Sequence, residues 1–194
     1  MTQTVNNIVV AGPVMVYVSS SVGEAAPANS IAKGTAWGGG WTEVGFTQDG
    51  VELEIETEKF EVVTDQYNAP VKDFITGQNM SFKFNAAEGT LTNLKQALGY
   101  GTVTSGSTES TLGVSAQDGI PTNYAVGFEG YAPGATSSAV YYRRVIIWNG
   151  SVQGNFSLSA KKDGVQTVEY TVKAFPYPSA TSTERLWKVI DRVV

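Results

Sequence analysis

A regular alternation of apolar and acidic residues over positions 51–58 constrains the fold more than any other part of the chain. Side chains that alternate with a period of two lie on opposite faces of a β-strand. One face of this predicted strand is apolar, and the other carries Glu52, Glu54, Glu56 and Glu58. Four like charges on one strand face repel one another. We therefore expect this face to contact water, cations or an acidic space.

The alternation changes phase beyond Thr57, because Phe60 and Val62 would otherwise lie on the side of the glutamates. We expect a bulge, a bend or a turn at this point, since a slip of one residue moves every later side chain to the other face. The dipeptide Asp49-Gly50 between two alternating segments predicts a hairpin turn. Residues 76–79 predict a second turn before an alternating strand over 80–86.

The composition predicts a mainly β fold in one domain. Glycine is abundant, at 21 of 194 residues, and turn formers separate segments rich in β-branched and aromatic residues. The chain is long enough for one well-packed core. We expect a single domain over 1–194, with an N-terminal arm or edge strand at 1–12, long loops at 20–40 and 101–119, and a C-terminal arm at 176–194. The second loop should hold one short strand near 112–115.

Four further strands are predicted at 124–131, 139–148, 155–161 and 165–175, with turns at Asn149-Gly150 and Asp163-Gly164. A single short helix is predicted from Thr90 to Leu98, with Thr90 as its cap and Gly99 as its stop. Its packing stripe comprises Leu91, Leu94 and Leu98. Residues 184–194 fit a helix and a strand equally well.

Trp37 and Trp41 flank a triple glycine at the end of the first long loop. Tryptophans in a glycine-rich loop predict anchors at an interface between subunits, and they fit equally well with a loop fixed to its own core. If the tryptophans are such anchors, the loop would be mobile in the isolated subunit and would become ordered when a partner binds.

The residue types exclude several classes of function. Cysteine and histidine are both absent, which removes thiolate metal sites, histidine-containing triads and the commonest zinc ligands. A net charge of −5 speaks against nonspecific binding to nucleic acid. An even row of glutamates lacks the paired geometry of a glycosidase, and no loop has a calcium-binding pattern. In the doublet Arg143-Arg144, we expect one ion-pair partner and one surface group. We predict that the chain is not an enzyme, that it binds no cofactor, and that it has no membrane-spanning segment and no signal peptide.

Three segments in order resemble the major tail tube proteins of long-tailed bacteriophages. They read WTEVGFTQDGVELE at 41–54, TDQYNAPV at 64–71 and EGTLTNLKQALG at 88–99. The resemblance is marked over 40–99 and weaker in the strands that follow. It leans towards the non-contractile type of tail, and it implies that the extra C-terminal immunoglobulin-like domain of some relatives is absent.

The resemblance implies a β-sandwich or barrel core with one flanking helix. Subunits would form hexameric rings that stack into a tube in the virion tail, after synthesis in the host cytoplasm. Partners would be other copies of the chain and further tail proteins, namely tape measure, terminator and baseplate or tip. Double-stranded DNA would pass through an acidic lumen without specific binding.

Two questions about sites follow from this resemblance. Glu52, Glu54 and Glu56 would line the lumen, or the row from Glu52 to Glu58 would meet cations at a subunit or ring interface. Further candidates for contacts between subunits are Asp65 and Gln66, with Trp37 and Trp41. The alternative class is a β-sandwich module that binds glycans, acts as an adhesin or decorates a virion, with Trp37, Trp41 and Tyr142 as ligand platforms.

Overall fold

The computed structural model describes residues 13–67, 69–115, 120–133, 141–153 and 167–193. These residues form ten strands and one helix, so the mainly β class predicted from the sequence is confirmed. The strands are β1 (Met15–Ser19), β2 (Trp41–Glu43), β3 (Thr47–Val62), β4 (Lys72–Ala86), β5 (Thr102–Ser105), β6 (Ser110–Gly113), β7 (Asn123–Tyr131), β8 (Tyr141–Val152), β9 (Val168–Ala174) and β10 (Lys188–Val193), and the helix is α1 (Leu91–Leu98).

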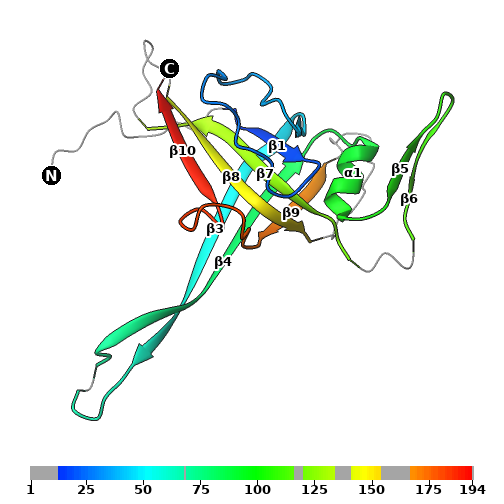
Figure 1. Ribbon diagram of the computed structural model, residues 1–194. Coiled ribbons are helices and arrows are strands. Elements are labelled where there is room, and N and C mark those ends of the chain that lie inside the picture. Colours follow the sequence, from blue (N-terminus) through cyan, green and yellow to red (C-terminus); the bar gives the residue numbers. More distant parts are fainter. Residues whose placement is uncertain (1–12, 68, 116–119, 134–140, 154–166, 194) are drawn as a thin grey trace.

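Eight of the strands form one antiparallel sheet in the order β2-β1-β7-β8-β9-β4-β3, with β10 paired to β8 beside this path. β5 and β6 form a separate two-stranded hairpin. Figure 1 shows two projections from the body, the long β3–β4 hairpin on one side and the β5–β6 hairpin on the other. Among the described strands β3 pairs only with β4, so within this part of the chain it lies at an open edge of the large sheet.

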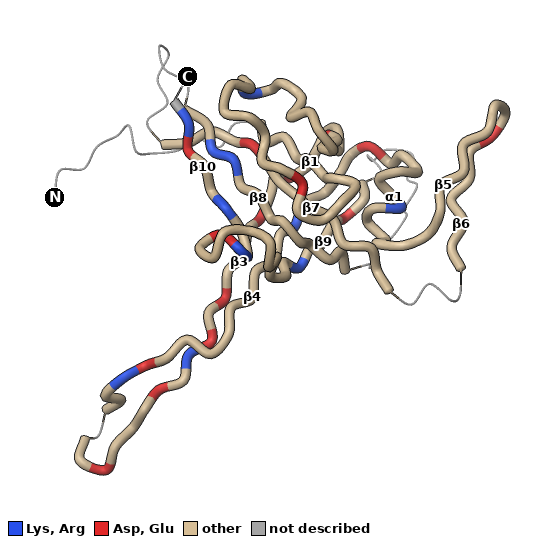
Figure 2. Tube along the Cα trace, viewed as in Figure 1, with Lys and Arg blue, Asp and Glu red and all other residues tan. Residues whose placement is uncertain are grey.

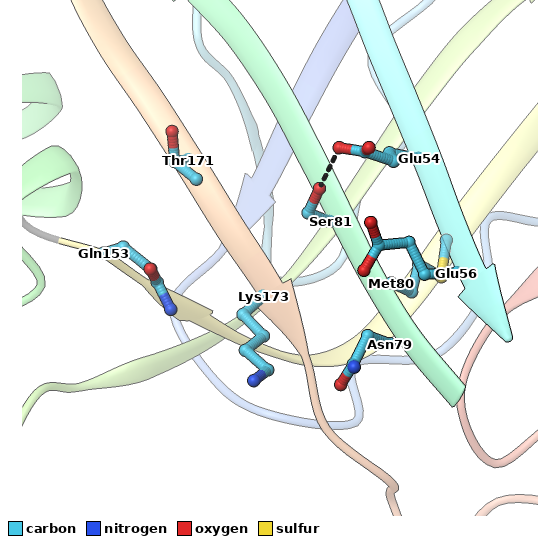
Figure 3. A pocket seen from close by; sticks show the side chains of 8 residues that line it. All are labelled: Glu54, Glu56, Asn79, Met80, Ser81, Gln153, Thr171 and Lys173. Atoms are coloured by element: carbon cyan, nitrogen blue, oxygen red, sulfur yellow. Dashed lines mark hydrogen bonds between the residues drawn. The ribbon is translucent and has the colours of Figure 1, made fainter. Parts of the chain in front are cut away.

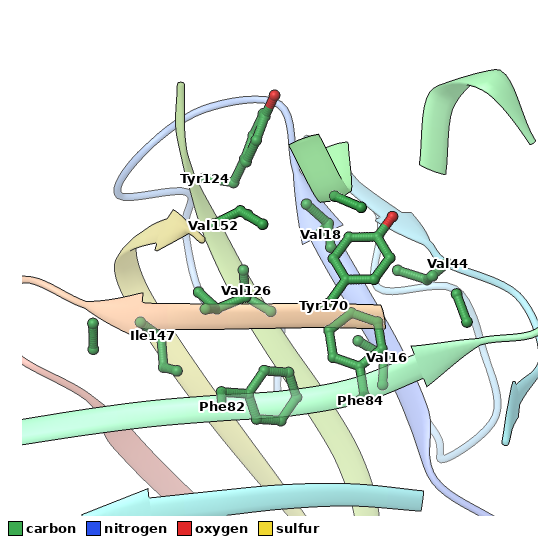
Figure 4. Packing of buried hydrophobic residues seen from close by; sticks show 14 of the residues in the cluster. Val16, Val18, Val44, Phe82, Phe84, Tyr124, Val126, Ile147, Val152 and Tyr170 are labelled. Carbon is green, nitrogen blue, oxygen red and sulfur yellow. The ribbon is translucent and has the colours of Figure 1, made fainter. Parts of the chain in front are cut away.

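The large sheet wraps around one apolar core. Phe82 of β4 stacks on Phe128 of β7 with ring centroids 5.3 Å apart, although β8 and β9 separate these strands in the sheet. Phe84 stacks on Tyr170 in the same cluster, at 4.4 Å. Figure 4 shows Val16 and Val18 of β1 beside the rings of Phe84 and Tyr170. The inward residues of β3, β4 and β9 alternate with polar ones, which is why the sequence pattern predicts these strands.

The outer face of β1, β7 and β8 is also buried. A second cluster there contains Tyr17, Trp37, Trp41, Ile146 and Trp148. The loop predicted at 20–40 supplies Trp37 and ends at Trp41, so it packs onto the sheet of its own subunit. Trp148 Nε1 donates to the carbonyl of Glu184 at 2.9 Å, which ties the C-terminal segment to the same face.

Three of the predicted turns are wrong. Asp49 and Gly50 have φ values of 64° and 76°, but they form a register shift within β3, so the chain does not reverse there. Residues 76–79 lie inside the continuous strand β4. Asn149 and Gly150 likewise lie inside β8, where Gly150 pairs with Tyr124 and Ala174.

The phase change beyond Thr57 coincides with a second register shift, between Glu58 and Lys59. Glu58 pairs with Gly77 and Lys59 pairs with Ile75, so the extra residue, Thr76, belongs to the partner strand. A bulge therefore lies at this point, but on β4. The expected change of phase in β3 is wrong, because β3 runs without interruption to Val62 and Phe60 stays on the side of the glutamates.

Other predictions have mixed outcomes. Residues 101–115 hold the two strands of the β5–β6 hairpin, whereas one strand was expected. The open question at the C-terminus is answered by strand β10. Strands β7, β8 and β9 confirm the predictions at 124–131, 139–148 and 165–175. The strand predicted at 155–161, the turn at Asp163-Gly164 and the arm at 1–12 lie outside the described residues.

Candidate functional site: an acidic strand face and a projecting arm

Glu52, Glu54, Glu56 and Glu58 of β3 are all exposed, and they lie on the face of the sheet opposite the core. Their neighbours Val51 and Leu53 point the other way and pack against the core cluster. The local pattern thus orients the strand, because burying the valine and leucine forces the intervening carboxylates outward.

The polar face continues across β4 and β9. Antiparallel register places Ser81 beside Glu54 and Lys173, and Lys83 beside Glu52 and Thr171. Figure 3 shows the side chains of Glu54, Ser81 and Lys173 around a shallow hollow of about 270 Å³. We call this surface the acidic face. It comprises Glu52, Glu54, Glu56 and Glu58 of β3, Asn79, Ser81 and Lys83 of β4, and Glu169, Thr171 and Lys173 of β9.

Glutamates outnumber lysines on the acidic face by five to two. Lys83 Nζ lies 3.5 Å from a carboxylate oxygen of Glu54, and the hydroxyl of Ser81 donates to the same oxygen at 3.4 Å. Both charged side chains are about half exposed, so this ion pair contributes little to stability. The face keeps a negative potential.

The distal part of the β3–β4 hairpin extends away from the body (Figure 1). β9 pairs with β4 from Ser81 to Ala86, and beyond this point no other described strand lies beside the hairpin. We call residues 55–67 and 69–79 the arm. Figure 2 shows that acidic residues recur along it, with lysines at intervals.

A salt bridge on the arm joins Lys59 and Asp73, whose charged atoms lie 2.8 Å apart. The hydrogen bond from Lys59 lowers the pKa of Asp73 below its ordinary value. Asp65 and Gln66, predicted as contacts between subunits, lie near the end of the arm and are exposed.

Trp37 and Trp41 occupy a different place from Asp65 and Gln66. They are 3% and 8% exposed, and they contact each other edge to face with centroids 5.1 Å apart. Trp37 stacks on Tyr17, and Trp41 Nε1 donates to the carbonyl of Ala25 at 2.8 Å. In the subunit the two rings therefore fix the 20–40 loop to its own sheet. The residues predicted as contacts between subunits therefore form two separate groups, the buried tryptophans on the body and the exposed Asp65 and Gln66 on the arm.

An internal ion pair that the sequence did not localise holds the same loop. Arg144 Nε donates to Glu129 Oε2 at 2.6 Å, and both side chains are 0% exposed. Gly34 N donates to the other oxygen of Glu129, and Arg144 Nη2 donates to the carbonyl of Ile31 at 2.7 Å. Arg143, the other half of the doublet, pairs with Asp191 at the surface. Both arginines thus have ion-pair partners.

The helix is as predicted at both ends. The Thr90 side chain accepts from Asn93 N, and Gly99 closes the helix with φ of 77°. Leu91, Leu94 and Leu98 are half-buried, and Leu94 packs against the core cluster. The predicted packing stripe did not include Asn93, which is buried and donates to the carbonyls of Val44 and Glu88.

The described residues offer no metal site, since no three Asp or Glu side chains among them are grouped to hold an ion. No helix in the described part of the chain has the length and apolar character needed to cross a membrane.

The chain matches a model of a known protein family. A family model described as phage tail tube protein matches residues 1–191. Comparison with curated proteins gives no match.

Proposed function

Because the chain belongs to the phage tail tube protein family, we propose that its copies form hexameric rings that stack into the tube and that its acidic face lines the lumen. The family gives the protein a structural role in the virion tail and indicates a protein without enzymatic activity. The DNA would leave the virion through this lumen, after assembly of the tail in the host cytoplasm. Other tail proteins would contact the ends of the tube.

The observation that carries the proposal for the lumen is the acidic face itself. A DNA duplex carries a dense row of phosphates, and a basic wall would bind it through counterion release. A wall with five glutamates against two lysines repels the duplex instead. The polar residues of β4 and β9 widen this wall from one strand to three, which suits a continuous surface.

The open edge of β3 supports the joining of subunits. β3 has 16 residues, and none of the described strands pairs with its far edge. Unpaired backbone groups on such an edge readily pair with another chain, and closure into a barrel removes the edge altogether. A ring in which neighbouring sheets join at this edge would satisfy β3 and place the acidic face inside.

Two other interpretations are less well supported. An acidic row at a contact between subunits would need a matching basic surface, and Lys83 already lies beside Glu54 within the subunit. A glycan-binding module would need exposed aromatic platforms, but Trp37, Trp41 and Tyr142 are all buried.

Electron microscopy of the purified protein tests the assembly. We expect hollow tubes of stacked rings, and a reconstruction should place Glu52, Glu54 and Glu56 on the inner wall. Protein that stays monomeric at every concentration, with other tail proteins included, would contradict the assembly. Glutamates on the outer surface of a tube would contradict only the lumen assignment.

Charge reversal tests the electrostatic role of the face. Tubes of Glu56→Lys should bind short DNA duplexes at low salt, with an affinity that falls as salt rises. The control is Glu109→Lys, which changes another exposed glutamate, between β5 and β6. If both variants bind DNA equally, the position of Glu56 in the lumen is refuted.

A further inference from the structure

The arm carries an unusual concentration of exposed apolar side chains. Seven of the thirteen large exposed hydrophobic residues among those described lie between positions 55 and 75. They are Ile55, Phe60, Val63, Tyr67, Val71, Phe74 and Ile75. Exposed apolar patches of this kind mark interaction sites, because leaving them in water costs free energy. The arm therefore needs a partner surface.

The side of β3 that carries the glutamates becomes apolar towards the end of the arm. Phe60 follows Glu58 on the same side of β3, and it pairs with Phe74 of β4. The two rings are 60% and 49% exposed. Lys72 Nζ lies 4.7 Å from the centroid of the Phe74 ring, so a cation accompanies the aromatic pair. This apolar tip with its cation is suited to an apolar groove that has carboxylates at its rim.

A groove of this description lies at the other end of β3. It has a volume of about 740 Å³, with Val14, Met15, Phe46 and Val51 as its apolar lining. The charged lining of the groove is Glu43, Asp49 and Lys33, and the two carboxylates are exposed.

Phe46 is preorganised in this groove. Its side chain is 80% exposed. Its backbone is held, because Phe46 N donates to Glu88 Oε1 at 3.1 Å and its carbonyl accepts from Ala87 N at 2.7 Å. An exposed aromatic ring on a fixed backbone loses little entropy on binding, as an interface anchor should.

The arm of a subunit cannot fill the groove of the same subunit. Val51 and Phe60 are nine positions apart on one continuous strand, which corresponds to about 30 Å at the usual rise of a strand. We propose that the groove binds the Phe60–Phe74 tip of a second copy, in the next ring of the tube. This proposal names the ring-to-ring contact, and it depends on the proposed function.

The positions of tip and groove explain why such a contact would propagate. A contact between two different surfaces at opposite ends of a subunit is heterologous and extends without closing. Each copy would offer a tip at one end and a groove at the other. The attraction of Lys72 to Glu43 and Asp49, together with its repulsion by Lys33, would select the orientation.

Disulfide trapping tests the contact, because the chain has no cysteine of its own. Phe46→Cys and Phe60→Cys variants, mixed and assembled, should form a disulfide-linked dimer several-fold faster than Phe46→Cys mixed with Ser105→Cys. Ser105 is an exposed control at the far end of β5. A chain with both Phe46→Cys and Phe60→Cys should give a ladder of dimers, trimers and longer products.

Several outcomes would overturn the inference. Phe60→Cys that crosslinks mainly with itself would indicate a tip-to-tip contact. Equal rates with the Ser105→Cys control would indicate random collision. An internal disulfide in a Thr4→Cys/Phe46→Cys chain, with no Phe46–Phe60 product, would place the chain's own N-terminal segment in the groove.

The same experiment separates the inference from the proposed function. If the wild-type protein forms tubes but the cysteine variants give no Phe46–Phe60 disulfide, the arm contact is refuted and the proposed tube is not. Wild-type protein that forms no tube refutes the proposed function, and the ring-to-ring contact with it.

Discussion

At the scale of single residues, the buried pair of Glu129 and Arg144 determines where the 20–40 loop lies. Arg144 reaches the carbonyls of Ala28 and Ile31, and Glu129 accepts from Gly34 N. A buried ion pair adds little net stability compared with an apolar pair, but removing one partner leaves an uncompensated charge in the interior. The pair thus makes the position of the loop specific.

We predict that Arg144→Met lowers the free energy of unfolding by about 3–5 kcal/mol, because Glu129 would stay buried and unpaired. Denaturant titration measures this loss. The matched control is Arg143→Met, whose exposed pair with Asp191 should contribute about 1 kcal/mol or less. Equal losses in both variants would show that the buried pair has no special role.

A second prediction at this scale concerns Tyr17. Burial, with the nearby charges of Glu43 and Glu129, raises its pKa from 10.0 to about 12. The folded protein therefore holds this proton more tightly than the unfolded chain does. The resulting stability is complete below pH 10 and is lost as the pH rises through 12.

Stability curves at alkaline pH check the prediction for Tyr17, with tyrosinate absorbance as the second signal. In Tyr17→Phe, which keeps the ring stacked on Trp37, the loss of stability between pH 10 and 12 should be smaller. An unchanged loss would assign it to other tyrosines, such as Tyr170, whose pKa burial also raises.

At the scale of elements, α1 shows how local signals determine the ends of a helix. We predict that Thr90→Ala destabilises the protein by about 1 kcal/mol, because Asn93 N loses its side-chain acceptor. Thr92→Ala is the control, since Thr92 lies in the helix and is exposed. Thermal or denaturant unfolding measures both. Losses of the same size would mean that the cap contributes nothing.

The strands and the helix could largely be predicted from the sequence, but the turns could not. Asp49-Gly50 does adopt the positive φ values that this dipeptide favours. The dipeptide predicts the local backbone conformation, whereas distant pairing decides whether the chain reverses. Val51 pairs with Phe84 of β4, and this long-range contact extends the strand through the dipeptide as a bulge.

The candidate site could be predicted only in part for a similar reason. The glutamate row follows directly from the period of two, because each residue depends only on its neighbours. The groove does not follow from such a local pattern, because its residues come from β1, the 20–40 loop and the start of β3. The apolar tip had a signal: Phe74 and Ile75 are adjacent, and adjacent apolar residues in a strand expose one on each face.

At the scale of the whole molecule, the arm stands apart from the packed body. Its apolar residues are exposed, and no strand of the described body lies beside it. The body keeps its core in β1, β7, β9 and the proximal part of β4. Changes at the tip should therefore separate assembly from stability.

We predict that the double variant Phe60→Ser/Phe74→Ser keeps its free energy of unfolding to within about 0.5 kcal/mol, as surface changes usually do. The same variant should form rings that fail to stack. Sedimentation and electron microscopy of the assembled protein measure the difference.

The matched control is Val114→Ser/Ile120→Ser, two exposed apolar residues away from the arm. Full-length tubes from the tip variant, or stacking lost equally in the control, would contradict the assignment of the tip.

The acidic row of β3 also has a consequence for the free subunit, before any tube exists. An open edge of 16 residues would invite two copies to pair wrongly, edge to edge. In the antiparallel alignment centred on Ile55, Glu52 would face Glu58 and Glu54 would face Glu56. Each pair would set like charges directly opposite, which is destabilising. The glutamates would thus disfavour mispairing of free subunits, and the edge of β3 would stay available for the neighbour proposed above.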